Sequence, residues 1–119
     1  ISFECNKNAN YHYIENLGYD NFYDILKSSN LFLGNSSAGI IESIYFKIPF
    51  INIGTRQSGR EYSKNIINVN WNIEQINLQI RKHLLLKSYK FKLTDSPYYK
   101  KNSVIYLFQK FNKILNQKK

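Results

Sequence analysis

The fold is decided by the stretch Leu33-Gly34-Asn35-Ser36-Ser37-Ala38-Gly39-Ile40-Ile41-Glu42, in which a short apolar run passes through small polar residues into a second apolar segment. An apolar run that ends in such a loop and continues at helical spacing is typical of a β-strand followed by an α-helix. We expect the strand over residues 31–33 and the helix from about residue 38 to residue 46. This pair is the repeating unit of a parallel α/β sheet.

The rest of the chain repeats the alternation of short apolar runs and amphipathic segments. Strands are expected over residues 11–14, 50–53 and 66–69, and helices over about 21–29, 72–86 and 103–116. This order predicts an α/β fold, with a mostly parallel sheet covered by helices on both faces. Ligands of such sheets bind beyond the carboxyl ends of the strands, so the loops 16–18, 34–37 and 54–60 are expected on one rim.

The composition of the chain is that of one small globular domain, with 119 residues of which 43% are hydrophobic. Cys5 is the only cysteine, which excludes an internal disulfide and a thiolate zinc cluster. His12 and His83 have no carboxylate or second histidine at ligand spacing, so neither a metal nor a cofactor is expected. No apolar run is long enough to span a membrane and nothing is typical of a signal peptide, so we expect a cytoplasmic protein without a membrane partner.

The formal net charge of +9 belongs to one end of the chain. Residues 1–80 hold six basic and seven acidic residues, whereas residues 81–119 hold eleven basic residues and only Asp95 as an acid. Lysines interleaved with Tyr98, Tyr99 and Tyr106 are compatible with a basic nucleic-acid-binding module, which we keep as an alternative. A solvated helix face and ordinary core packing explain the same residues, so no nucleic-acid partner is expected.

The loop around Ser36 and Ser37 is a candidate anion site. At the start of the expected helix, free backbone N–H groups and the helix dipole both favour an anion, and the two hydroxyls add donors. A phosphate or diphosphate fits there, and Glu42, about one turn further on, suits the two hydroxyls of a ribose. The alternative is that one serine only caps the helix and that Glu42 is an ordinary early-helix acid.

A second polar loop follows the strand expected over residues 50–53. It carries Arg56 and Arg60, and guanidinium groups on the rim of a suspected phosphate site suit charge-assisted hydrogen bonds to phosphate oxygens. The alternative is that both arginines are solvated, with Arg60 paired to Glu61. No set of nucleophile, base and orienting group can be assembled from the sequence, so no catalytic residue is expected in this chain.

Three segments resemble the hydrolysing UDP-N-acetylglucosamine 2-epimerase family: GNSSAGIIES at 34–43, IPFINIGTRQSGRE at 48–61 and NIINV at 65–69. The Asp-Ser-Gly-Gly and Thr-Glu-Arg-Pro segments of non-hydrolysing relatives do not occur. The resemblance, which runs from about residue 11 to residue 86, implies a GT-B fold of two Rossmann-like halves. Residues 1–119 would be the carboxyl-terminal, nucleotide-binding half, and the start at Ile1 without any methionine indicates a piece of a longer protein.

The resemblance also implies roles for particular residues. Ser36 and Ser37 would hold the UDP diphosphate, Arg56 the phosphates and Glu42 the ribose hydroxyls. Leu17, with its two neighbours, would line the uracil side through backbone atoms, and Arg60 matches the motif. The donor-binding half of a GT-B glycosyltransferase, which would share the diphosphate site and the acidic ribose contact, stays open as an alternative.

The reaction that the family implies is elimination of UDP to a glycal, followed by hydration to free N-acetylmannosamine or a related 2-acetamido sugar for sialic-acid and nonulosonate synthesis. Proton transfer would rely on carboxylates of the amino-terminal half, so residues 1–119 alone are expected to be inactive. The expected partners are a UDP-sugar and that half, and the full-length protein is expected to be a homo-oligomer.

Overall fold

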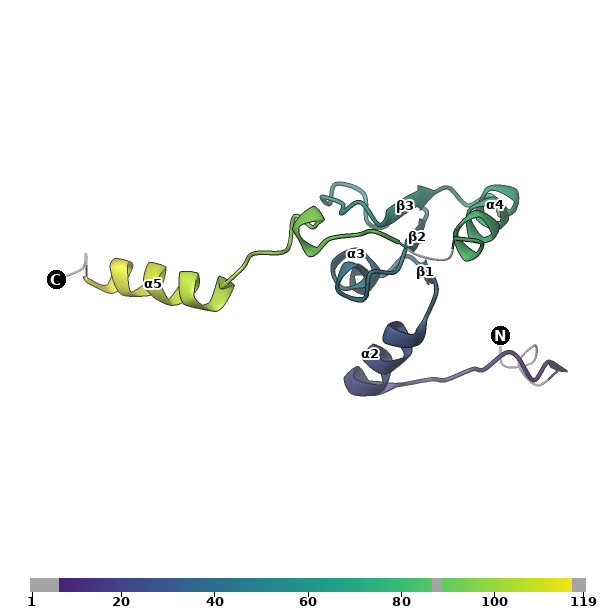
Figure 1. The fold of residues 1–119 in the computed structure, drawn as a ribbon, viewed down its shortest axis with the longest axis horizontal. Helices are drawn as coiled ribbons and strands as arrows, with labels where there is room; N and C mark the ends of the chain where they lie inside the picture. The colour runs from purple at the N-terminus through teal and green to yellow at the C-terminus, as the bar shows by residue number, and fades with distance from the viewer. Residues whose placement is uncertain (1–6, 87–88, 117–119) are drawn as a thin grey trace.

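The computed structural model describes residues 7–86 and 89–116, and these form the α/β domain that the sequence predicts (Figure 1). Its three strands form one parallel sheet in the order β1-β2-β3. In chain order the elements are α2 (Gly18–Ser28), β1 (Phe32–Gly34), α3 (Ser37–Ile41), the 3₁₀ helix η1 (Ser43–Phe46), β2 (Phe50–Ile53), β3 (Ile66–Val69), α4 (Ile73–Leu84), the 3₁₀ helix η2 (Leu93–Asp95) and α5 (Ser103–Asn116).

Helices α3 and α4 lie on opposite faces of the sheet (Figure 1). Because side chains alternate along a strand, Ile51 and Ile53 of β2 share one face, where they pack with Val69 and Ile76 in the core beneath α4. Phe50 and Asn52 share the other face, on which α3 lies. The prediction of a parallel sheet covered on both faces is therefore confirmed.

Helix α3 approaches the sheet closely because Gly39 has no side chain. A Cβ built at Gly39 would overlap the aromatic ring of Phe50, which is fully buried. Ile40 and Ile44, which flank this contact, are also fully buried. The contact between Gly39 and Phe50 therefore sets the height of α3 above the sheet.

Aromatic side chains attach α2 to the same face. The ring centroid of Phe22 lies 6.0 Å from that of Phe32 on β1, and Tyr23 stacks on Phe46 of η1 at 5.7 Å. Leu26, on the same helix, is 3% exposed. Helix α2 thus lies in the same layer as α3, although residues 7–17 before it form no strand.

A buried asparagine ties together the loops at the amino ends of β2 and β3. Asn65 is fully buried, and its Nδ2 donates to the Ile48 carbonyl oxygen at 2.8 Å and to Ser43 Oγ at 2.7 Å. Its Oδ1 accepts a hydrogen bond from Ser63 Oγ at 2.8 Å. Every polar atom of this side chain is satisfied within the protein, as burial of an amide requires.

Two predicted elements differ from the structure. Residues 11–14 are not a strand, because this segment pairs with no strand within residues 7–86 and 89–116 and stays exposed, with Tyr11 57% and Tyr13 53% accessible. High β-propensity does not make a strand without a neighbouring edge to bond. The helix expected over residues 38–46 is divided into α3 and η1, and it ends at Lys47, whose positive φ of 57° stops the helix before Pro49.

Helix α5 forms where its apolar period predicts, but it extends away from the sheet (Figure 1). The apolar side chains of residues 104–111 remain accessible, with Val104 77%, Phe108 66% and Phe111 64% exposed. Tyr106 is covered on one side by Lys100, whose Nζ lies 3.2 Å from the ring centroid. Among the described residues, no helix is both long and apolar enough to cross a membrane.

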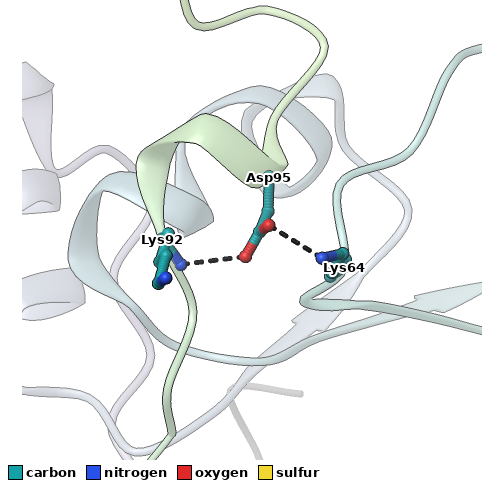
Figure 2. A network of polar contacts seen from close by, with 3 residues as sticks. All are labelled: Lys64, Lys92 and Asp95. Carbon is teal, nitrogen blue, oxygen red and sulfur yellow. Dashed lines mark hydrogen bonds and ion pairs between the residues drawn. The ribbon is translucent and has the colours of Figure 1, made fainter.

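Asp95 closes η2 and joins it to the loop before β3 (Figure 2). One carboxylate oxygen accepts from the backbone N–H of Lys92 at 3.0 Å, and the other forms an ion pair with Lys64 Nζ at 2.9 Å. The hydrogen bond from Lys64, and next the one from the Lys92 backbone, lower the pKa of Asp95.

Replacing Gly39 by alanine should destabilise the domain by about 1–3 kcal/mol, since the added methyl group must push α3 away from Phe50. Urea unfolding followed by circular dichroism measures this change. Gly34→Ala is the matched control, because a Cβ there meets nothing within 4 Å. A Gly39→Ala variant as stable as the control would contradict this account of the packing.

Stability should depend on the ionisation of Asp95 at acidic pH. Because its folded-state pKa is lowered, its contribution is complete above the ordinary aspartate pKa and is lost as the pH falls through the lowered value. The difference in unfolding free energy between wild type and Asp95→Asn should be present at pH 7 and should shrink as the pH falls below the ordinary aspartate pKa. Lys64→Gln, which removes the ion pair and leaves the hydrogen bond from the Lys92 backbone, should reproduce part of this loss at pH 7.

Candidate functional site

The two polar loops that follow β1 and β2 lie together at the carboxyl edge of the sheet. Strands β1 and β2 are parallel, and Gly34 lies opposite Asn52, so both strands end at the same edge of the sheet. A hydrogen bond of 2.8 Å from Gln57 Nε2 to the Asn35 carbonyl oxygen joins the loops. The prediction that 34–37 and 54–60 share one rim is confirmed.

Ser36 is the N-cap of α3, and Ser37 is the first residue of the helix. The Ser36 backbone is extended, and its Oγ accepts a hydrogen bond from Gly39 N at 3.3 Å. The prediction that one serine caps the helix is therefore confirmed for Ser36. The cap uses the hydroxyl oxygen as an acceptor and does not use the hydroxyl hydrogen. Ser37 is exposed at the rim.

Glu42 ends α3 and faces α2. A hydrogen bond to its carboxylate is the largest cause of the raised pKa of the Tyr23 phenol, followed by burial and by the negative charge. Glu42 Oε2 is buried and has no hydrogen-bond partner among the described residues. The contact with Tyr23 is one that the sequence did not predict, and the ribose role of Glu42 stays a prediction.

Arg56 and Arg60 lie in a tightly turned loop with their side chains exposed. The loop begins at Gly54 with φ of 77°, and Ser58 N donates to the Thr55 carbonyl oxygen at 2.9 Å. Although both residues are described, no ion pair joins Arg60 to Glu61, so the alternative of a paired Arg60 gains no support. Backbone hydrogen bonds thus hold the turn, and both arginine side chains are exposed to solvent.

Leu17 lines a hollow of about 390 Å³, formed by residues 14–19 and 22 at the start of α2. The loop is held by a hydrogen bond from Gly18 N to Asn16 Oδ1 at 3.0 Å. Because residues 11–14, which lead into this loop, do not form a strand, the reasoning that assigned the loop to the sheet rim started from a wrong element. Its placement beside the other two loops stays a prediction.

Sequence reasoning missed two buried amides. Gln57 is 5% exposed and Asn52 is 1% exposed, and each carries a buried side-chain oxygen with no partner among the described residues. Asn52 Nδ2 donates to Asn68 Oδ1 across the strands at 2.7 Å. Asn52 could have been noticed in the sequence, because it is a polar residue inside the apolar run 50–53. Nothing in the sequence distinguished Gln57 from an ordinary loop residue.

A smaller hollow of about 240 Å³ opens where β2 and β3 end. It is lined mainly by uncharged polar residues, namely Gly54, Thr55, Ser58, Tyr62, Asn68, Val69, Asn70 and Gln75. The indole of Trp71 occupies the space above Gly54 in which a side chain would otherwise stand. Since Trp71 is the only tryptophan and is 76% exposed, it provides a single spectroscopic reporter beside the Arg56 loop.

The parallel sheet and its polar carboxyl edge define an α/β domain of the kind that binds ligands beyond its strand ends. The chain belongs to the UDP-N-acetylglucosamine 2-epimerase family, whose model matches residues 2–111.

Curated relatives agree with this membership. Over 64 residues, which cover 53% of this chain, it is 45% identical to a GDP/UDP-N,N'-diacetylbacillosamine 2-epimerase (hydrolyzing) from Campylobacter jejuni, of which it spans 17%. It is 41% identical over 71 residues, 60% of the chain, to a UDP-N,N'-diacetylbacillosamine 2-epimerase (hydrolyzing) from Legionella pneumophila, of which it spans 19%. Over 88% of the chain it is 31% identical to the polysialic acid biosynthesis protein P7 of Escherichia coli, spanning 27% of that protein. The chain thus covers less than a third of each of these relatives.

The two serines should differ in their effect on stability. Ser36→Ala removes the cap of α3 and should lower the free energy of unfolding by about 1 kcal/mol, whereas Ser37→Ala should change it by less than about 0.5 kcal/mol. Urea unfolding at neutral pH measures both. Equal losses in the two variants would show that Ser36 is not the structural serine of the pair.

Proposed function

We propose that this chain is the UDP-binding half of a hydrolysing 2-epimerase that acts on UDP-N-acetylglucosamine or on a UDP-linked diacetylated amino sugar. The observation that supports the proposal most directly is the hydrogen bond from Gln57 Nε2 to the Asn35 carbonyl oxygen, which joins the two rim loops. It brings the serine loop and the arginine loop to one edge, in a chain whose family acts on this class of nucleotide sugar. Two relatives are named hydrolyzing enzymes, which supports that mode of reaction.

In this proposal the diphosphate binds between the two loops. The hydroxyls of Ser36 and Ser37, together with the backbone N–H groups of Ser37 and Ala38 in the first turn of α3, donate to phosphate oxygens. Arg56 extends from the other loop and neutralises their charge, with Arg60 close to it in the same turn. Exposure of both arginine side chains leaves them free to reorient toward a ligand.

The nucleoside would be held by the remaining predicted residues. Glu42 accepts from the ribose hydroxyls through its carboxylate, whose Oε2 has no hydrogen-bond partner among the described residues. The hollow at Leu17 receives the uracil, which residues 16–18 line largely through backbone atoms. For Glu42 this role requires the carboxylate to exchange part of its contact with Tyr23 for the ribose.

The reaction would eliminate UDP from the sugar to give a glycal, and water would then add to release a free N-acetylmannosamine-type sugar. What this half supplies is stabilisation of the departing UDP, because hydrogen-bond donors around the diphosphate stabilise the negative charge that leaves with it. The protons are moved by carboxylates of an amino-terminal half that closes over the sugar. We further propose that the complete protein is a cytoplasmic homo-oligomer serving sialic-acid or related nonulosonate synthesis, as the name of the Escherichia coli relative suggests.

UDP should bind to this chain and shift the Trp71 indole signal together with amide signals of residues 35–38 and 54–60 in ¹H–¹⁵N NMR spectra. Arg56→Ala should weaken binding by about ten- to a hundredfold, since a hydrogen bond to a charged group contributes about 1.5–3 kcal/mol. Ser37→Ala should weaken binding by a smaller factor of about five.

Arg81→Ala is the matched control, because it removes the same charge from an exposed position on α4. Equal UDP affinity in wild type and Arg56→Ala would contradict the assignment of Arg56. No response of the folded wild type to UDP would overturn the UDP site. Binding of oligonucleotides that is lost on removal of residues 100–119 would favour the nucleic-acid alternative instead.

A further inference from the structure

We propose that Gln57 is the positioning residue of this site, because its side chain fastens the loop that carries Arg56 to the loop that carries Ser36 and Ser37. The proposal rests on the proposed UDP function and extends it to a residue that would not itself hold the phosphates. Gln57 and Asn35 are separated by 22 positions in the chain, and each is next to a predicted phosphate contact.

The chemistry of the bond fixes the orientation of the amide. The Asn35 carbonyl oxygen can only accept, so the group that faces it at 2.8 Å must be the Nε2 donor of Gln57. Gln57 is 5% exposed, so water cannot readily replace the bond if the side chain is removed. Loss of the donor would leave a rim carbonyl without this partner.

The backbone of Gln57 is held as firmly as its side chain. Its carbonyl oxygen accepts from Tyr62 Oη at 2.8 Å and from Arg60 N at 3.3 Å. Gln57 is therefore the point at which the turn of the arginine loop and the start of α3 are tied together. Its neighbour Arg56 is exposed, so burial of Gln57 leaves the guanidinium free on the outside of the turn.

The consequence for binding is preorganisation. A flexible Arg56 loop would have to be ordered whenever a diphosphate bound, and that entropy would be subtracted from the affinity. When the hydrogen bond between the Gln57 side chain and the Asn35 carbonyl oxygen, which we call the latch, is formed, the loop is already ordered before the ligand binds. The latch between Gln57 and Asn35 thus acts on affinity through Arg56, without contact to the ligand.

Gln57→Met keeps the length and approximate volume of the side chain and removes its donor, whereas Gln57→Glu puts a carboxylate in its place. Gln109→Met, on the exposed part of α5, is the matched control. Gln57→Met should weaken UDP binding about tenfold, measured by NMR titration, and Gln109→Met should leave it unchanged. Without ligand, the amide signals of residues 35–37 should move in Gln57→Met and stay in place in Gln109→Met.

Gln57→Glu provides a further measurement, the pH dependence of the NMR signals of residues 35–37, which a merely structural role of Gln57 would not change. An ionised carboxylate repels the Asn35 carbonyl oxygen, but a protonated carboxyl group donates to it. Burial raises the pKa of the introduced carboxyl group, whereas the Arg56 and Arg60 guanidinium groups of the same loop act in the opposite direction. In ligand-free Gln57→Glu, the signals of residues 35–37 should therefore return toward their wild-type positions as the pH falls from 8 to 5. Wild type should show no such transition.

The possible outcomes separate the two proposals. If wild type binds UDP and Gln57→Met binds it equally well, the positioning role is overturned while the UDP site stands. If wild type does not bind UDP, the UDP site and the binding role of Gln57 both fall, and the ligand-free spectra still decide whether the latch exists. If Gln57→Met does not fold, the pH series of Gln57→Glu decides, and unchanged signals of residues 35–37 across that series overturn the latch.

Discussion

The contact between Gly39 and the Phe50 ring fixes helix α3 directly on the sheet, and the geometry of the rim follows from it. Since α3 begins only two residues before Gly39, its first turn cannot lie far from the strand ends. A larger side chain at Gly39 would lift the helix and draw Ser36 and Ser37 away from the loop after β2. A packing contact in the core therefore sets the distance between the two halves of the proposed diphosphate site.

Strands this short need help from buried side chains. β1 has three residues and β2 and β3 have four each, so few ladder hydrogen bonds hold the sheet. At the amino end, Asn65 donates to the Ile48 carbonyl oxygen, and at the carboxyl end Gln57 donates to that of Asn35. Both are buried neutral amides that satisfy a loop carbonyl. The same device stabilises the fold at one end and shapes the candidate site at the other.

The helices and strands were predicted from the sequence more accurately than the contacts that they make. β2 and β3 were predicted because a run of apolar, largely β-branched residues bounded by turn residues carries its own signal. Residues 11–14 have a similar composition but no edge to pair with, and propensity does not reveal whether a partner exists. Ser36, Ser37 and Arg56 could be proposed from their loops, whereas the hydrogen bond that joins these loops became visible only in three dimensions, because a glutamine in a polar turn resembles any other.

The charge distribution explains why a neutral latch suits this rim. Residues 1–80 hold six basic and seven acidic residues, so a diphosphate there would depend on a few aimed donors rather than on a broad positive field. A carboxylate fastening the loops would attract Arg56 and compete with the phosphates for it. Gln57 instead directs its donor to a carbonyl oxygen and adds no charge. The guanidinium groups of Arg56 and Arg60 stay exposed at the rim, and neither forms an ion pair within the part of the chain that the structure describes. Holding the loops by an amide thus keeps the charge of the arginines available for an anionic ligand.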